Sequence, residues 1–332
     1  MQRSLVFLVL IGVSICLSAC KTRQNTISEV ENKKWEYVIT SDGSHPIKRH
    51  EAAFVVVGDK FYLLGGRGIR NVSVYDTNTN SWSTGKKPPL EFHHFQPIVY
   101  QNNIYVIGAM TGQYPNETPV PNIYYYNTSL DIWVKDKEIP FERRRGSTGN
   151  SIKDGVVYIA CGIVNGHKSG HQNWFDSYEL NNKEWTVLPN APRARDHFQT
   201  AELNGKIYAV GGRLSKAPNA TFTETISEVD VYNIEKKEWS TLSDDLPTER
   251  AGSITIAYHN DILVIGGESG TQNTAHNEVE GLNTLTEKWH TYPSLIQGRH
   301  GTGAFLFKGS MYIASGCGNR GGSPELTTME KY

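Results

Sequence analysis

The sequence predicts an all-β protein, a six-bladed β-propeller with four antiparallel strands in each blade. Three observations lead to this prediction. A hairpin whose second strand ends in two small residues occurs six times, at intervals of about fifty residues. A tyrosine on the next strand follows in five copies, and Leu282 takes its place in the other copy. A tryptophan stands seven residues after that position in the first five copies.

The second strand of the hairpin is the most regular part of each repeat. Its six copies are Lys60–Gly66, Asn103–Ala109, Val156–Gly162, Lys206–Gly212, Asp261–Gly267 and Ser310–Gly316. The small residues at its end allow the following loop to turn sharply with positive φ. A single sheet of this kind leaves open edges and an unburied face, so the sheets are expected to pack around one axis.

The two ends of the repeat region complement each other. Lys34–Thr40 has the tryptophan and the alternation of a fourth strand, but no first three strands precede it. The last copy stops at Tyr332, without its fourth strand. We therefore expect the N-terminal strand to complete the last blade and close the ring.

Repeats with this strand, Gly-Gly, Tyr and Trp pattern resemble kelch repeats, and the resemblance covers about Trp35 to Tyr332. The family implies a propeller that binds other molecules at one face. Exported bacterial kelch propellers such as the sialic acid mutarotase family are similar in blade number and in having an export signal. That resemblance extends to the architecture and to no catalytic motif.

The N-terminus is typical of an exported protein. Arg3 precedes the apolar run Leu5–Leu17, which predicts a signal peptide over residues 1–19. The sequence Leu-Ser-Ala-Cys ending at Cys20 resembles the bacterial lipobox, which implies lipidation of Cys20 and a membrane anchor. Residues 20–33 are expected to be a flexible tether and 34–332 the propeller. The resemblance to such lipoproteins also implies an outer-membrane location, since Lys21 rather than Asp follows the cysteine, and the sequence leaves open which side of that membrane the protein faces.

Composition narrows the range of partners. The formal net charge of −1 and the export signal argue against nucleic acid as a partner.

Cys161 and Cys317 fall in the third and sixth copies, which face each other across the ring, so we expect two small core residues and no disulfide. A monomer is expected.

One position upstream of each hairpin carries candidate ligand-binding groups. The residue thirteen positions before the second-strand tyrosine, or before Leu263 in the fifth copy, is arginine in five copies and Phe92 in the second. Equivalent positions place these guanidinium groups at one rim. If the first strand has already begun there, the residues two positions later face the same side. These are Glu51, His94, Ser147, His197, Gly252 and Gly301.

The loops after the small-residue pairs leave from the same rim and add Arg67, Arg213, Glu268 and Arg320. The rim is therefore expected to be basic. The first-strand arginines have two interpretations: they bond carbonyl or carboxylate groups of neighbouring blades, or they converge on an anionic ligand through bidentate contacts. Trp174 is either a platform for a sugar ring or a buried aromatic at a strand start. The predicted ligand-binding residues are Arg49, Arg67, His94, Arg145, Arg195, Arg213, Arg250, Arg299, Trp174 and Arg320.

No metal or other cofactor is predicted. His167 and His171 lie four residues apart in a glycine-containing loop, but no Cys or Asp stands at metal-ligand spacing from them.

Two classes of function remain open. In the first, the propeller binds an anionic ligand, a carbohydrate or a partner protein without breaking a bond. In the second, which the mutarotase resemblance implies, it is an enzyme that acts on a carboxylated sugar. The acid/base candidates are His197, His300, Glu268 and Glu51. Whether the protein is an enzyme is not decided by the sequence.

Overall fold

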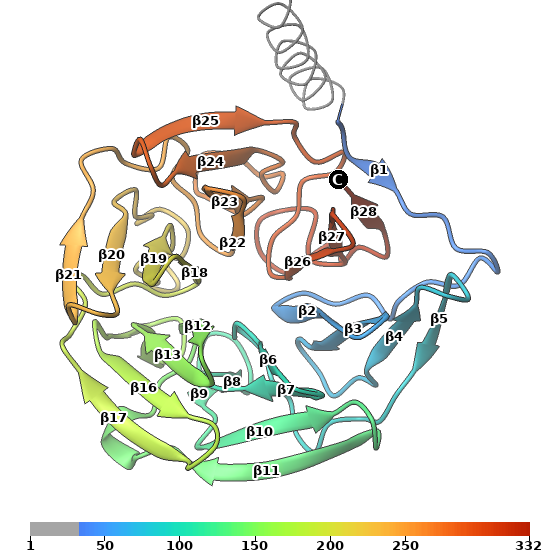
Figure 1. The fold of residues 1–332 in the computed structure, drawn as a ribbon, viewed down its shortest axis with the longest axis horizontal. Coiled ribbons are helices and arrows are strands. Elements are labelled where there is room, and N and C mark those ends of the chain that lie inside the picture. The colour runs from blue at the N-terminus through green and yellow to red at the C-terminus, as the bar shows by residue number, and fades with distance from the viewer. Residues whose placement is uncertain (1–32) are drawn as a thin grey trace, which may run out of the picture.

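Six four-stranded antiparallel sheets surround a central channel in the computed structural model, which describes residues 33–332 (Figure 1). The predicted architecture of six four-stranded blades is confirmed. The predicted signal peptide, Cys20 and nearly all of the predicted tether lie outside the described residues.

Each blade runs from an innermost strand to an outermost one. Blade 1 contains β2 (Ala52–Val57), β3 (Lys60–Gly65), β4 (Ser73–Asp76) and β5 (Ser81–Thr84). Blade 2 contains β6 (Ile98–Tyr100), β7 (Asn103–Val106), β10 (Asn122–Asn127) and β11 (Ile132–Glu138). Blade 3 contains β12 (Gly149–Lys153), β13 (Val156–Ala160), β16 (Phe175–Glu179) and β17 (Glu184–Leu188).

The second half of the ring repeats this plan. Blade 4 contains β18 (Gln199–Leu203), β19 (Lys206–Val210), β20 (Asp230–Asn233) and β21 (Glu238–Thr241). Blade 5 contains β22 (Ile254–Tyr258), β23 (Asp261–Ile265), β24 (Val279–Asn283) and β25 (Lys288–Tyr292). Blade 6 contains β26 (Ala304–Phe307), β27 (Ser310–Ala314), β28 (Met329–Lys331) and β1 (Glu36–Tyr37).

The ring closes where the N-terminal strand joins the last blade, as predicted. Strand β1 pairs antiparallel with β28, with Glu36 opposite Lys331. Trp35 lies 5.4 Å from Tyr332, measured between ring centroids. In blades 1 to 4 the third-strand tyrosine and fourth-strand tryptophan of one blade make the same kind of contact, at 5.2–6.1 Å. Trp35 therefore supplies to blade 6 the ring that Tyr332 lacks downstream.

Neighbouring blades are held together by apolar clusters and by these tryptophans. A separate buried cluster fills each of the six spaces between adjacent sheets. The indole N–H groups of Trp133, Trp239, Trp289 and Trp35 also donate to backbone carbonyl groups of the preceding blade. Cys161 and Cys317 are buried and unpaired, which confirms their predicted role as small core residues.

Two glutamines cross the central channel and divide it. The Gln96 side chain accepts from the backbone N–H groups of Asn150 and Thr200, so it joins blades 2, 3 and 4. Gln199 donates to the Thr302 carbonyl group and accepts from the N–H of Thr255, so it joins blades 4, 5 and 6. These bonds satisfy the open edges of the innermost strands.

The loops at one end of the channel are longer and carry their own small hairpins. Strands β8 (Met110–Thr111) and β9 (Thr118–Pro119) form one hairpin, and β14 (Ile163–Asn165) and β15 (Ser169–His171) form the other. A single 3₁₀ turn, η1 (Phe141–Arg143), is found in the described chain. We call the loop-rich end of the channel the mouth. Within residues 33–332, no helix is long and apolar enough to cross a membrane.

Candidate functional site

The six residues that stand two positions after the arginine series, one in each blade, share one backbone conformation at the mouth. Glu51, His94, Ser147 and His197 all have φ between 53° and 59°. Gly252 and Gly301, at the same position in blades 5 and 6, have φ of 61° and 63°. The innermost strand begins only after this position, at Ala52 in blade 1. The left-handed residue reverses the direction of the side chains, so these six residues face the axis.

The arginines two positions earlier point away from the axis, into the protein. Their relative exposure is 2 % or less. Each guanidinium group donates to the backbone carbonyl group sixteen residues later, at 2.6–3.0 Å. The structure therefore corrects the prediction that these groups bind a ligand, because burial and internal acceptors occupy them. The corrected residues are Arg49, Arg145, Arg195, Arg250 and Arg299.

Four of the five buried arginines also pair with a carboxylate on the third strand. The pairs are Arg145–Asp176, Arg195–Asp230, Arg250–Glu280 and Arg299–Glu330. Ser73 stands at the carboxylate position in blade 1, and burial and nearby Arg70 lower the pKa of Arg49 to about 9. Blade 2 has Phe92 and Tyr124 at these two positions, with ring centroids 5.0 Å apart. An aromatic pair thus replaces the ion pair in one blade.

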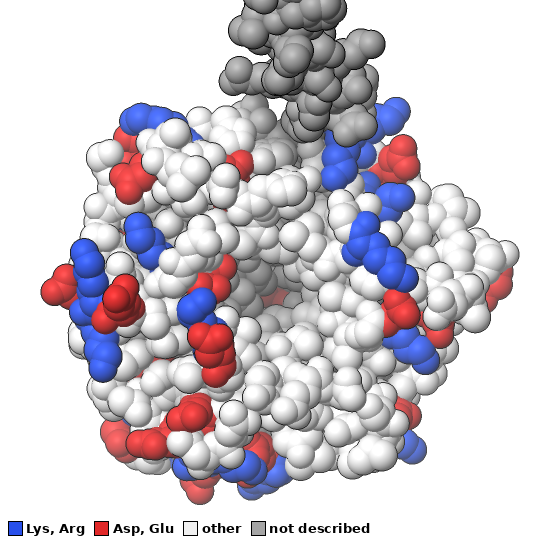
Figure 2. Space-filling model, in the orientation of Figure 1, with Lys and Arg blue, Asp and Glu red and all other residues white. Residues whose placement is uncertain are grey.

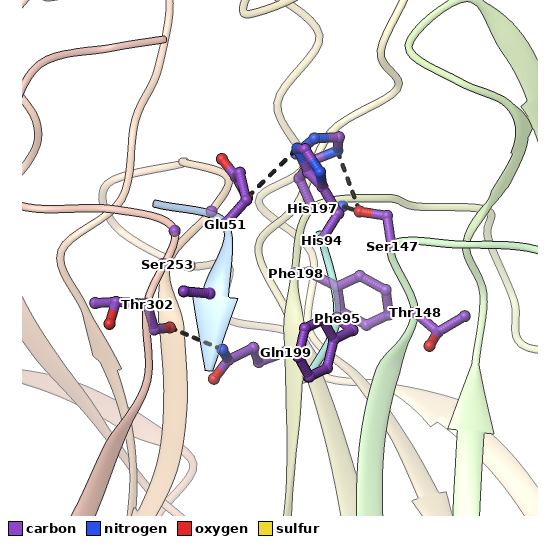
Figure 3. Close-up of a pocket in the computed structure, with 13 residues that line it drawn as sticks. Glu51, His94, Phe95, Ser147, Thr148, His197, Phe198, Gln199, Ser253 and Thr302 are labelled. Atoms are coloured by element: carbon purple, nitrogen blue, oxygen red, sulfur yellow. Dashed lines mark hydrogen bonds and ion pairs between the residues drawn. The ribbon is translucent and has the colours of Figure 1, made fainter. Parts of the chain in front are cut away.

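A pocket of about 510 Å³ opens at the mouth. Its lining residues come from loops of blades 1 to 6 and include Glu51, His94, Arg213 and Glu268. A cavity of about 30 Å³ lies deeper in the channel, where Glu51, His94 and His197 sit above the rings of Phe95 and Phe198 (Figure 3). The left-handed position therefore supplies groups to both spaces.

The charges at the mouth are balanced, so the predicted basic rim is wrong. Arg213 donates to Glu268 at 2.5 Å, and Arg67 donates to Glu117 at 2.6 Å. Charges of both signs are also intermixed around the outer part of the face of the ring that Figure 2 shows. Attraction of an anion at long range is therefore weak, and recognition depends on close contacts.

On one side of the pocket a protonated histidine lies between two carboxylates. His300 Nδ1 is 3.7 Å from Glu51 and Nε2 is 3.4 Å from Glu268. Burial alone would lower the pKa of His300, but Glu268 and Glu51 raise it to about 10. Burial would raise the pKa of Glu268, but His300 and Arg213 lower it to about 2. At neutral pH the three groups therefore form a charged network.

Two glycines make room for this network. A Cβ atom on Gly301 would lie 2.8 Å from the Glu51 backbone nitrogen and 3.0 Å from its carboxylate. One on Gly252 would lie 3.4 Å from His300 Nδ1. The absence of side chains at these two mouth positions thus lets Glu51 and His300 fill the space.

On the other side of the pocket three histidines meet edge to face. The ring centroids of His94, His167 and His197 are 4.6–4.9 Å apart. His94 and His197 come from the left-handed positions of blades 2 and 4, and His167 comes from the β14–β15 hairpin of blade 3. Burial, together with Arg213, lowers the pKa of His197 to about 4, and burial also lowers that of His94. These two imidazoles are neutral at pH 7.

The other candidates divide into those at the pocket and those outside it. Arg67 and Arg213 line the pocket, and the Arg320 guanidinium lies 5.6 Å from the Phe222 ring at its edge. Trp174 is half-buried outside the pocket and stacks on Arg143 and Arg145 at 4.5 and 5.7 Å, so the interpretation as a sugar platform is wrong. His171 does not line the pocket: its Nε2 donates to the Ser215 carbonyl group and lies 3.4 Å from the Asp196 carboxylate.

Comparison with known proteins agrees with this architecture. Residues 17–279 match the family model described as the Attractin/LZTR1 beta-propeller. The chain belongs to this family. It is 26 % identical to Kelch-like protein terF of Aspergillus terreus over 329 residues, which cover 93 % of this chain and 70 % of that protein.

Two further comparisons concern the repeats and the fold. The chain is 22 % identical to human Kelch-like protein 23 over 275 residues, covering 82 % of this chain and 46 % of the human protein. It therefore spans about half the length of that relative. The solved structure of YjhT superimposes with a TM-score of 0.71 at 14 % identity, covering 86 % of this chain and 95 % of that one. This likeness shows the fold alone.

Four residues of this family propeller's site were not found by sequence reasoning. Glu117 and Asp196 accept hydrogen bonds from histidines of the site, and Tyr114 and Phe222 line the pocket from loops that carry no motif. Asp196 could have been found, because it stands next to His197 in the register of the repeats. The three others lie in loops of irregular length, where the period of the repeat gives no alignment.

Proposed function

We propose that the protein binds a small hydroxylated ligand that carries a carboxylate, such as an acidic sugar, in the pocket at the mouth. The observation that carries the proposal is the pocket of about 510 Å³ in which guanidinium, carboxylate and aromatic groups converge. This volume lies within the usual range for small-molecule sites. A sugar of this kind has hydroxyl groups for the carboxylates and imidazoles, and an anionic group for an arginine.

The two arginines of the pocket retain free donors. Arg213 uses Nε on Ser215 and Nη1 on Glu268, and Nη2 finds no acceptor among residues 33–332. Arg67 uses both terminal nitrogens, on Gly112 and Glu117, and its Nε finds no acceptor in the same part of the chain. Because their internal bonds hold both groups in place, little side-chain entropy is lost when a carboxylate binds.

Two aromatic rings complete the lining. Tyr114 is 48 % exposed, and its ring lies 5.1 Å from that of His167. Phe222 is half-buried and lies 5.1 Å from the Arg213 guanidinium carbon. Flat apolar faces beside hydrogen-bonding groups suit the two kinds of surface of a sugar ring.

Calorimetric titration with glucuronate and with its neutral amide tests the proposal. The full chain is expected to bind the carboxylate about ten- to a hundredfold more tightly, the value of a charge-assisted hydrogen bond. Phe222→Ala is expected to weaken binding, and Tyr37→Ala, which removes an exposed ring on β1, is the matched control. Equal binding of acid and amide, or no effect of Phe222→Ala, contradicts the proposal. Binding of a partner protein at the mouth with no sugar bound would support the other form of the binding hypothesis.

An enzyme of the sugar mutarotase or epimerase type is the second candidate. One observation favours it: oxygen or nitrogen atoms of Glu51, Glu268 and His300 lie within 4.8 Å of one another beside the pocket. A carboxylate can accept the proton of the anomeric hydroxyl while an imidazolium donates one to the ring oxygen. The bond between the anomeric carbon and the ring oxygen then breaks, and the ring opens by general acid–base catalysis. His197 has a lower priority, since its Nδ1 donates to Asp196 and its Nε2 faces His167 rather than open space.

Anomer exchange separates the two candidates. Proton NMR saturation transfer between the anomers of N-acetylneuraminate is expected to be accelerated by the wild-type chain and slowed by Glu51→Gln. Glu278→Gln, a change on the same face outside the pocket, is the control. Ligand binding without any acceleration of exchange would support the binding function and exclude the enzyme for that sugar.

Export and lipid anchoring complete the proposal, on the basis of the sequence around Cys20. We propose that the mature chain begins at a lipidated Cys20 and is held at the outer membrane of the bacterial envelope. Mass spectrometry of the mature N-terminus tests this, with a diacylglyceryl or triacylated cysteine as the expected species. An unmodified N-terminus at another residue would overturn it.

A further inference from the structure

The three histidines at the mouth, His94, His167 and His197, are each oriented by a hydrogen bond at Nδ1, the ring nitrogen on the side away from the other two rings. Asp196 Oδ1 accepts from His197 Nδ1, and Glu117 Oε2 accepts from His167 Nδ1 at 2.9 Å. Both carboxylates are themselves fixed: Asp196 accepts from Ser215 at 2.6 and 3.0 Å, and Glu117 accepts from Arg67. They are therefore ionised acceptors, and each Nδ1 carries a hydrogen.

The third histidine is oriented by its neighbour in the chain. His93 Nε2 donates to the Gly112 carbonyl group at 3.2 Å, which leaves a lone pair on His93 Nδ1. His94 Nδ1 lies 2.6 Å from that atom, so the hydrogen between them belongs to His94. All three rings are then Nδ1–H tautomers, with a lone pair on Nε2.

These lone pairs converge. Nε2 of His167 and Nε2 of His197 are only 2.9 Å apart, and one ring nitrogen of each of the three histidines lies within 4.8 Å of the others. Two lone pairs at that distance repel each other unless a cation lies between them. The groups behind the rings supply no proton for Nε2, since they fix the hydrogens on Nδ1.

We propose that His94, His167 and His197 form a binding site for one divalent transition-metal ion, with its open coordination position facing the pocket. Three histidine ligands with an open fourth position are typical of catalytic Zn²⁺ sites, and carboxylates that hold the distal N–H are typical of zinc-bound histidines. A tetrahedral Zn²⁺ with bonds of about 2.0–2.1 Å spaces its nitrogens about 3.3 Å apart, so small movements of these rings suffice.

The open side of the site meets the pocket. His94 and His167 both line the pocket, and the Glu51 carboxylate lies 3.4 Å from His94 Nε2. Glu51 is thus placed to be the fourth ligand, or to accept a hydrogen bond from a water molecule on the ion. The Glu51, Glu268 and His300 group is the weaker candidate for a metal, because His300 Nε2 donates to the carbonyl groups of Asn319 and Gly321 and Glu268 is paired with Arg213.

Metal analysis tests this site in the absence of any sugar, so its outcome is independent of the ligand proposed above. The full chain is stripped with a chelator and titrated with Zn²⁺, and with Co²⁺, whose visible absorption reports tetrahedral nitrogen coordination. About one ion per chain is expected. Absence of saturable binding of Zn²⁺, Co²⁺, Ni²⁺ and Cu²⁺ would overturn the proposal.

Variants separate the three histidines from other histidines on the same face. His167→Gln is expected to lower Zn²⁺ affinity at least about a hundredfold, and Asp196→Asn, which removes the charge of the group that accepts from His197 Nδ1 but keeps its shape, about ten- to a hundredfold. His276→Gln is the matched control, since His276 is buried on the same face and bonds Ser269 and Glu278. It should bind as the wild type does. Equal affinity of all four chains, or an equal loss in the control, overturns the assignment. Should His167→Gln not fold, the Asp196→Asn result and the Co²⁺ spectrum of the wild type still decide.

Discussion

The layer of buried arginines and the mouth are built from positions only two residues apart in every blade, and they differ in how their residues vary. Five arginines repeat at the first position, and their donors are used on carbonyl groups of their own blade. The second position carries Glu, His, Ser, His, Gly and Gly, and these face the axis. In this propeller, repetition marks contacts that hold each blade together, and divergence marks the surface that can meet a ligand.

The largest expected effect comes from breaking a pair in the arginine layer. Arg250→Met leaves Glu280 buried without its partner, and the free energy of unfolding should fall by about 3–5 kcal/mol. Urea denaturation followed by circular dichroism measures it. The double change Arg250→Phe with Glu280→Tyr copies blade 2, so it should recover most of the loss. A double variant less stable than Arg250→Met would show that the two arrangements are not equivalent.

A smaller loss is expected where the layer has no carboxylate. Arg49 meets Ser73 in place of an acid, so Arg49→Met strands no buried charge. It leaves carbonyl acceptors unpaired, and the expected cost is about 1–3 kcal/mol in the same denaturation measurement. A loss equal to that of Arg250→Met would contradict the view that the buried carboxylate sets the cost.

At the mouth, the expected effect depends on pH. Because the pKa of His300 rises from about 6.5 in the unfolded chain to about 10 in the folded one, its stabilisation is complete below pH 6.5 and is lost as the pH rises through 10. The stability difference between wild type and His300→Gln should therefore shrink from pH 6 to pH 10 in urea titrations of the metal-free chain. His276→Gln is the control, since burial lowers the pKa of His276. A stability difference between wild type and His300→Gln that grows from pH 6 to pH 10 would contradict a raised pKa for His300.

The smallest effect belongs to the outer surface. Lys308 and Asp59 form an exposed ion pair between blades 6 and 1, with side chains 68 % and 52 % exposed. Lys308→Ala should change the free energy of unfolding by no more than about 1 kcal/mol, because water and salt screen such pairs. A loss comparable with that of Arg49→Met would mean that this contact between the first and last blades contributes to ring closure.

The fold was predictable because its signals are local and repeated. The strand, Gly-Gly, Tyr and Trp pattern gave the number of blades, and the unpaired Trp35 and Tyr332 gave the closure. The residues of the site were found in part, since Glu51, His94, His197, Glu268 and Arg213 follow the same register. The sequence did not predict which of these residues lie together in space, because that depends on the direction in which each side chain points.

That direction depends on one backbone feature. Glu51, His94 and His197 are themselves neither glycine nor asparagine, so the sign of positive φ at their position is indirect: it lies in Gly252 and Gly301, which occupy the same position in blades 5 and 6. Assuming an extended strand puts the arginines and the mouth residues on one side, whereas the left-handed residue separates them. His167 was missed as a partner of His94 and His197 because the hairpin that carries it has no counterpart in the other blades.

The near-sixfold backbone of the mouth has consequences for any molecule that enters it. A molecule rotated by one blade would meet the same main-chain atoms. A hydroxyl group that had faced Glu51 would then face an imidazole or a glycine without a side chain. Only one of six rotational settings keeps every partner, so the ring imposes an orientation on its guest through side chains alone. Exchanging residues among these six positions would turn the preferred setting without altering the scaffold.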